Sequence, residues 1–294
     1  MHRGRGQRSG KGGERAGLSA VLVLSVAWLV FPAAAQQPGP IKPPAPAAAP
    51  SKGSSTISNE LPSIPVEQII QRFAERESEL RKERENFAYE QSFIFQTIDL
   101  DGRPDGEYRM DSDVLFTPLG KRYEKVTYAP LPTLMRLALT QQDLSDLQNV
   151  QPFLLSTEEL PKYDVRYVGR QRLDELTTYV FDVAPKTIEK NQRYFQGRIW
   201  VDDHDLEIVK TDGKAVPDFK RGGNENIFPR FETYRENIEK NFWFPTYTRS
   251  DDVLHFHSGG DVRIRLRVRY KNYRRFRSSG RIVGPAQPVP PDKP

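Results

Sequence analysis

The chain has 294 residues, no cysteine and a formal net charge of +5 at pH 7. The absence of cysteine excludes disulfide bonds, thiol catalysis and thiolate metal sites. Residues 1–35 carry five Lys or Arg residues and one Glu, so the rest of the chain has a charge of about +1 and no overall field that would attract nucleic acid.

The first 35 residues predict an export signal. Basic residues precede an apolar run at 18–31, and three alanines at 33–35 suit a signal peptidase that cleaves before Gln36. The apolar run is shorter than the roughly 20 residues that a spanning helix needs. An uncleaved N-terminal anchor is the alternative. We expect an exported protein, placed in the periplasm or outside the cell.

Two segments have the composition of disordered chain. Residues 36–62 and 278–294 are rich in Pro, Ala, Gly and Ser, and they contain too few apolar residues to form a core. We interpret them as a linker and a tail. The segment between them, residues 63–277, has the length of one sizeable domain.

The domain opens with a predicted helix. Pro65 suits the first helical turn, and Val66, Ile69, Phe73 and Leu80 recur on one helical face. The opposite face is rich in Glu and Arg, as expected of a solvated surface. The helix is expected to end near Asn86.

Strand patterns follow over 86–100, 107–116 and 121–129, with a turn-rich stretch at 101–106. Residues 131–161 predict a helical insertion that prolines delimit. Strand patterns then resume and continue to residue 277. About 11 strands with few helices predict an α+β fold, in which helices cover one curved antiparallel sheet.

Residues 262–271 alternate between apolar and basic side chains, which is typical of a half-buried antiparallel strand. The basic set is Arg263, Arg265, Arg267, Arg269 and Lys271. We interpret it as a solvated face whose charges pair with acids on neighbouring strands, for example Asp251 and Glu232. Contact with an anionic surface such as lipid headgroups is one alternative. Nucleic-acid binding is another, although no aromatic stacking platform accompanies the arginines.

Catalytic motifs are absent from the sequence, which has no G-x-S-x-G, phosphate-binding glycine loop or H-E-x-x-H. His255 and His257 could hold a metal from one strand face, but solvent exposure is the simpler interpretation. Asp202, Asp203 and Asp205 indicate a hairpin turn, with a weak Ca²⁺ site as the alternative. We expect no enzymatic activity, no metal and no cofactor.

Aromatic residues are frequent in the predicted strands and are candidates for the inner side of the sheet, among them Phe87, Phe195 and Phe242. We predict an apolar ligand-binding pocket on that side. Its predicted lining is Phe93, Phe95, Tyr179, Phe181, Trp200, Trp243 and Leu266. The alternative is that these side chains form an ordinary filled core beneath the helices.

Two short segments carry a family resemblance. In "RIWVDDHD", Trp200, Val201 and Asp202 end a strand at a turn, and "NFWFPTY" places Trp243 before Phe244 and a proline. These segments, and the order of the predicted elements over roughly 65–285, resemble the outer-membrane lipoprotein-sorting proteins of the LolA/LolB-like superfamily. The resemblance implies an open (half) β-barrel that is lined with apolar residues, has helices as a lid, and shelters acyl chains in the periplasm.

The expected function is therefore that of a periplasmic, non-enzymatic carrier for the acyl part of a lipid or lipoprotein. We expect a monomer that contacts the membrane or envelope proteins transiently and does not bind nucleic acid. One alternative is an envelope binding or sensing module of the same fold that recognises a protein partner through its arginine face. An envelope hydrolase is the other.

Overall fold

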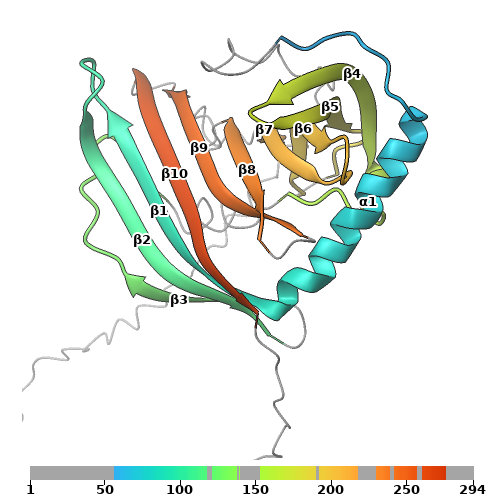
Figure 1. The fold of residues 1–294 in the computed structure, drawn as a ribbon. Helices are drawn as coiled ribbons and strands as arrows, with labels where there is room; N and C mark the ends of the chain where they lie inside the picture. Colours follow the sequence, from blue (N-terminus) through green and yellow to red (C-terminus); the bar gives the residue numbers. More distant parts are fainter. Residues whose placement is uncertain are drawn as a thin grey trace, which may run out of the picture. The chain divides into compact units, whose positions relative to one another are not determined.

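The computed structural model describes residues 56–117, 121–137, 139, 153–189, 192–217, 230–238, 242–256 and 260–275. Strands in these ranges form one antiparallel sheet in the order β3-β2-β1-β10-β9-β8-β7-β6-β5-β4 (Figure 1). Their bounds are β1 Phe87–Ile98, β2 Pro104–Phe116, β3 Arg122–Tyr128, β4 Tyr163–Leu173, β5 Leu176–Pro185, β6 Tyr194–Asp202, β7 Ile208–Val216, β8 Phe231–Asn237, β9 Trp243–Phe256 and β10 Gly260–Arg275.

The strand order confirms a single antiparallel sheet that is not closed, because β3 and β4 lie at opposite edges. The strand count is ten in the described ranges, instead of the expected eleven. Strands that follow one another in sequence pair with each other, except for β3 and β4, and β10 returns to pair with β1. This return makes the first and last strands of the domain interior strands of the sheet.

The predicted first helix is present as α1, Val66–Glu83, which continues into the 3-10 turn η1, Arg84–Asn86. Its apolar stripe packs on one face of the sheet. The ring of Phe73 lies 5.7 Å from the ring of Phe181 on β5. Near the other end of the helix, Leu80 packs against Phe87 and Phe244, on β1 and β9. Figure 1 shows the helix crossing between these parts of the sheet.

The prediction of a helical insertion at 131–161 is wrong for the residues that the structure describes. Residues 131–137 and 153–159 contain no helix, and only the 3-10 turn η2, Leu160–Lys162, lies in this stretch. Pro130 and Pro132 disfavour helix around them, and the backbone N–H of Thr133 donates to the carbonyl oxygen of Glu107 at 2.9 Å. Residues 138 and 140–152 lie outside the described ranges.

The ordered domain begins before Ser63, so the assignment of all of 36–62 to a disordered linker needs correction. Ser58 and Arg170 on β4 exchange two backbone hydrogen bonds of 2.8 and 2.9 Å. Tyr167 also donates its hydroxyl hydrogen to the carbonyl oxygen of Glu60 at 2.6 Å. The contact requires a glycine on β4, because a Cβ at Gly169 would lie 2.0 Å from the Ser58 carbonyl oxygen. Residues before 56 lie outside the described ranges.

Candidate functional site

One row of residues crosses the face of the sheet that α1 covers, which we call the inner face. Residues directly opposite each other in an antiparallel pair point to the same side. Strand by strand from β4 to β2, the row is Tyr167, Phe181, Ile199, Thr211, Thr233, Thr248, Val268, Phe93 and Met110. The row is therefore apolar at both ends and carries three threonines in the middle, on β7, β8 and β9.

Five of the seven predicted ligand-lining residues lie on the inner face, in two clusters. Phe93, Phe95 and Leu266 pack together on β1 and β10, where Phe95 is directly opposite Leu266. Tyr179 and Phe181 pack in a second cluster with the α1 side chains. The structure thus places these five residues on one face, at both ends of the row, and all of them are buried.

Trp200 and Trp243 are not on the inner face. They belong to a separate cluster with Val180 and Val209 on the opposite side of the sheet, the outer face. The cause is the alternation of side chains along a strand: Trp200 is five residues from the inner-face Phe195, so the two side chains point to opposite faces. Buried Trp200 donates its indole N–H to Gln171 at 2.6 Å.

The three threonines of the inner row, which we call the threonine row, are at most 2% exposed. The hydroxyl oxygens of Thr233 and Thr248 are 2.9 Å apart, and Thr248 is 3.4 Å from the hydroxyl of Tyr270. The hydroxyl of Thr211 has no hydrogen-bond partner, and neither has that of Thr246 on β9. Sequence reasoning missed this row because threonine is a common strand residue; the strand register alone brings the three together.

A buried group of charges joins α1 to β8 on the inner side. Arg235 donates to the two carboxylate oxygens of Glu77 at 2.6 and 3.2 Å, and to the carbonyl oxygen of Phe153 at 2.7 Å. Both side chains of the pair are nearly fully buried. Glu207, 2% exposed, lies before β7, and neither of its carboxylate oxygens has a hydrogen-bond partner. Burial, with Glu77 nearby, raises the pKa of Glu207 to about 8.

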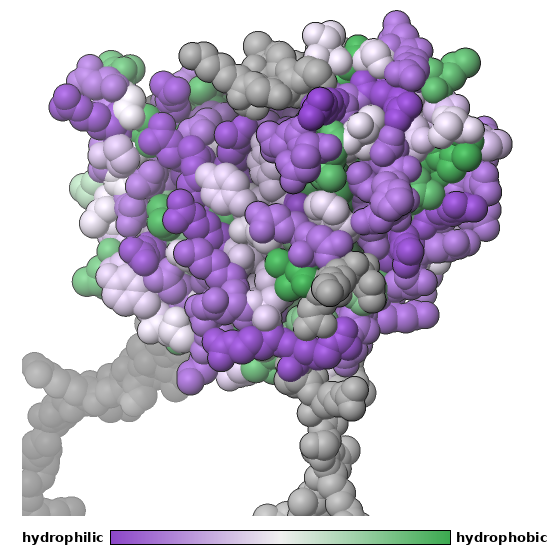
Figure 2. All heavy atoms as spheres, in the orientation of Figure 1, coloured by the Kyte–Doolittle hydropathy of each residue, from purple (hydrophilic) through white to green (hydrophobic). Residues whose placement is uncertain are grey.

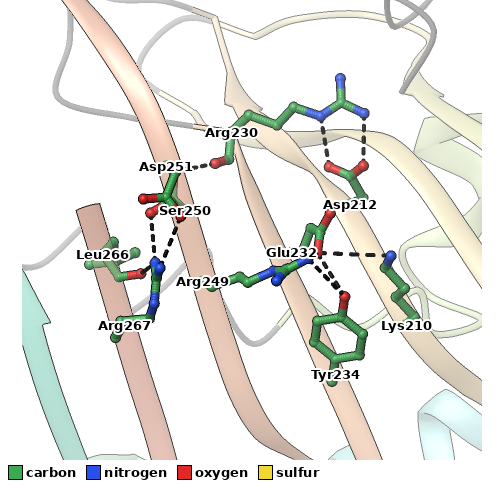
Figure 3. A network of polar contacts seen from close by, with 10 residues as sticks. All are labelled: Lys210, Asp212, Arg230, Glu232, Tyr234, Arg249, Ser250, Asp251, Leu266 and Arg267. Atoms are coloured by element: carbon green, nitrogen blue, oxygen red, sulfur yellow. Dashed lines mark hydrogen bonds and ion pairs between the residues drawn. The ribbon is translucent and has the colours of Figure 1, made fainter. Parts of the chain in front are cut away.

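The outer face carries a row of charges in the same register. From β4 to β10 it consists of Arg166, Asp182, Arg198, Asp212, Glu232, Arg249 and Arg267. Asp182 pairs with Arg198 at 2.8 Å and with Arg166 at 2.7 Å. Arg230, which precedes β8, reaches both carboxylate oxygens of Asp212 at 2.7 and 3.0 Å (Figure 3).

Glu232 is a second centre of this outer network (Figure 3). Its carboxylate accepts hydrogen bonds from Arg249 at 2.9 Å and from Tyr234 at 2.8 Å, and it lies 3.9 Å from the ammonium of Lys210. Burial raises the pKa of Glu232, but Lys210, Arg249 and the hydrogen bond from Tyr234 together lower it below its usual value. The burial of Lys210 lowers the pKa of its own ammonium group, which lies 4.6 Å from the centre of the Trp200 ring.

The arginines of β10 lie on this outer face, as the alternation predicted. Arg265 and Arg267 each contact the carboxylate of Asp251 at 2.9 Å. Arg263 and Arg269 are exposed, and no ion pair holds either of them within the described ranges. The solvated-face interpretation of this strand is thereby confirmed, with Asp251 as the pairing acid. The predicted pairing with Glu232 is wrong, because Glu232 pairs with Arg249 of β9. The molecular face drawn in Figure 2 is mostly hydrophilic, with hydrophobic residues scattered in small groups.

The histidine and aspartate candidates have structural partners. His255 lies 2.7 Å from the carboxylate of Asp261, and His257 is outside the described residues. The carboxylate of Asp202 accepts the backbone N–H groups of His204 and Asp205, which fits the predicted turn. Among the residues that the structure describes, no group of three or more potential ligands is arranged to hold a metal ion. A search of the same ranges finds no helix with the length and hydropathy needed to cross a membrane.

No protein-family model matches the chain, and no curated protein is significantly similar to it. Among solved structures, a DUF1329 family protein from Desulfovibrio piger is similar over 72% of this chain and 93% of its own, with 14% identity and a TM-score of 0.38. MucB is similar over 70% of this chain and 92% of its own, with 12% identity and a TM-score of 0.23. Likenesses this distant give no basis for transferring a function to this chain.

Proposed function

We propose that this protein is an exported, non-enzymatic binding protein that shelters the acyl chains of a lipid or lipoprotein against the inner face of its sheet. The observation that carries the proposal is the composition of that face. Apolar side chains gather at both ends of the inner row, around Phe181 and around Leu266. Between these ends the row itself carries the short side chains of Thr211, Thr233 and Thr248. The larger inner-face residues of the same strands, such as Phe231 and Phe244, lie at other positions along β8 and β9.

The binding energy would come from burial. Each methylene removed from water contributes about 0.8 kcal/mol, so a chain of a dozen or more methylenes provides affinity without a strong polar contact. In this proposal α1 is the cover, since its apolar stripe already packs on the inner face through Phe73 and Leu80. The periplasm remains the proposed compartment, on the strength of the signal-like residues 1–35.

An environment-sensitive apolar dye tests the proposal on the protein that begins at Gln36. Dye fluorescence should rise on binding and fall when a long-chain fatty acid or a phospholipid competes. The matched control is the double variant Arg263→Thr/Arg269→Thr, whose changes lie on the outer face and should leave dye binding unchanged. If no dye or acyl probe binds to the folded protein, the proposal is wrong.

The outer face of β10 favours a second candidate, a module that recognises an anionic partner protein or surface. Arg263 and Arg269 are exposed cations, in contrast to Arg265 and Arg267, which share Asp251. This candidate predicts that the same Arg263→Thr/Arg269→Thr variant loses salt-sensitive binding to anionic vesicles or to an envelope partner. The two candidates are therefore separated by one variant and two binding measurements.

A further inference from the structure

We propose that the threonine row, Thr211, Thr233 and Thr248, is a subsite for an uncharged polar group, such as an ester, that lies within an otherwise apolar ligand. This inference rests on the proposed function and specifies the chemical class of the ligand. The three side chains come from β7, β8 and β9 and stand directly opposite one another in the strand register. A ligand laid along the inner row would have apolar neighbours on both sides of this point.

The unpaired hydroxyl groups are the first evidence. Thr211 is 2% exposed, and its hydroxyl has no hydrogen-bond partner, although Thr233 and Thr248 bond to each other next to it. The hydroxyl of Thr246, on β9 two residues from Thr248, is also buried without a partner. A buried polar atom without a partner costs stability. Two such hydroxyl groups on one side of the sheet point to a hydrogen-bonding group that comes from outside the chain.

The charges around the row are the second evidence, because they exclude a charged group. Arg235 is already held by Glu77, and the carboxylate of Asp252 on β9 accepts the backbone N–H groups of Arg230 and Val253. The outer-face charges next to the row, such as Lys210 and Asp212, point to the other side of the sheet. No free cation remains beside the row within the described ranges to neutralise a phosphate or a carboxylate, whereas hydroxyl groups suit a neutral carbonyl.

The third evidence concerns Glu207, a buried carboxyl on the inner side that has no hydrogen-bond partner. Because burial raises the pKa of this carboxyl to about 8, it is mostly protonated at neutral pH and adds no charge to the inner side. Since the charges of Arg235 and Glu77 neutralise each other, the described part of the inner face near the threonine row is thus polar without a net charge. An ester linkage between acyl chain and headgroup has this chemistry, with hydrocarbon on at least one side of a carbonyl that accepts hydrogen bonds.

The test compares two probes of equal length, methyl palmitate and hexadecyl methyl ether, by competition against an apolar dye. The wild type should bind the ester about 2- to 10-fold more tightly, the range that one hydrogen bond provides. Thr211→Val, which keeps the shape and removes the hydroxyl, should bind the two probes equally. Thr211→Ser should restore the preference. The control Thr177→Val changes an exposed threonine on β5 and should keep the full preference.

Thermal unfolding of the ligand-free variants provides a second readout. Thr211→Val should unfold at a higher temperature than the wild type, because it removes an unpaired buried hydroxyl. An equal affinity of the wild type for ester and ether, or a Thr211→Val variant that keeps the preference, would overturn the inference while leaving acyl binding intact. If neither probe binds to the folded wild type, the proposed function itself fails.

Discussion

The two faces of the sheet are built from the same strands, but they differ in how far their polar side chains are paired. On each strand the inner row and the outer row differ by a single position, as in Thr211 and Asp212 on β7 or Thr248 and Arg249 on β9. On the outer face the half-buried charges satisfy one another: Asp212 holds Arg230, and Glu232 holds Arg249. On the inner face, the hydroxyls of Thr211 and Thr246 and the carboxyl of Glu207 have no partner.

The outer face also has a buried atom without a partner, the indole nitrogen of Trp243, but its row of charges from Arg166 to Arg267 is paired. The inner face instead combines two hydroxyl groups and a carboxyl without partners. Pairs of exposed or half-exposed charges contribute little stability. They do keep the outer face hydrated and discourage pairing with other chains. Buried polar atoms without partners cost stability and are retained where function requires them. This difference supports our proposal that the ligand binds on the inner face, and the following predictions test it from the largest expected effect to the smallest.

The largest effect is expected at the buried pair of α1 and β8. Arg235→Met leaves the carboxylate of Glu77 buried without its cation, which should lower the free energy of unfolding by about 3–5 kcal/mol. Glu79→Gln is the matched control on the same helix, because it breaks the exposed pair with Arg76 at 3.0 Å and should cost under about 1 kcal/mol. Urea unfolding measures both, and equal losses would contradict the assigned role of the buried pair.

Neighbouring residues of β10 compare the faces directly. Leu266→Ala creates a cavity on the inner face at a fully buried position and should cost about 2–5 kcal/mol. Arg267→Thr removes an outer-face ion pair with Asp251 and should cost under about 1 kcal/mol. If Arg267→Thr unfolds the protein, the assignment of this residue to the solvated face is wrong.

Glu207 should make stability depend on pH. Its pKa is raised from 4.5 to about 8 in the folded protein, so the folded state binds the proton more tightly than the unfolded state. The stability that this tighter proton binding contributes is therefore fully present below about pH 4.5. It decreases as the pH rises and is lost above about pH 8. Glu207→Gln cannot ionise, so its urea midpoint should decline less than that of the wild type between pH 5 and pH 9. Parallel curves for the two proteins would contradict the account.

The outer apolar cluster provides the smallest effect. Ile57 packs on the cluster around Trp200, and Ser58 pairs with Arg170. A protein that begins at Ser63 loses these contacts and should be less stable than one that begins at Gln36, by about 1–3 kcal/mol if two or three hydrogen bonds are lost. A protein that begins at Ile57 serves as the control and should unfold at the same temperature as the longer form.

The sheet was predictable because its signals are local. Strict alternation placed Leu266 inside and Arg267 outside, and the apolar stripe of α1 identified Phe73 and Leu80 as its buried side. The same alternation could have excluded the two tryptophans from the inner face. Trp200 is an odd number of positions from the inner-face Phe195, and Trp243 is adjacent to the inner-face Phe244, so both side chains point to the outer face. The apolar and capping pattern of 131–161, by contrast, wrongly suggested helix at 131–137, where prolines and the pairing of Thr133 with β2 decide the conformation.

The polar part of the site was not predictable, because it depends on contacts between distant segments. Glu77 and Arg235 are 158 positions apart, and nothing in the local pattern around either residue indicates the pair. The threonine row likewise requires the register of three strands. Ser58 was assigned to the linker because residues 36–62 are rich in Pro, Ala, Gly and Ser, whereas its pairing depends on Gly169, more than a hundred positions away.

Native mass spectrometry of the protein purified from the envelope of its own cells, without detergent or organic solvent, tests the central claim most directly. The account predicts a bound species of one to a few acyl chains per protein, released as an ester-containing lipid on denaturation. It further predicts that Thr211→Val retains less of that lipid than Thr177→Val. A folded protein that carries only its bare mass, and that takes up no ester lipid when one is supplied, would contradict the account.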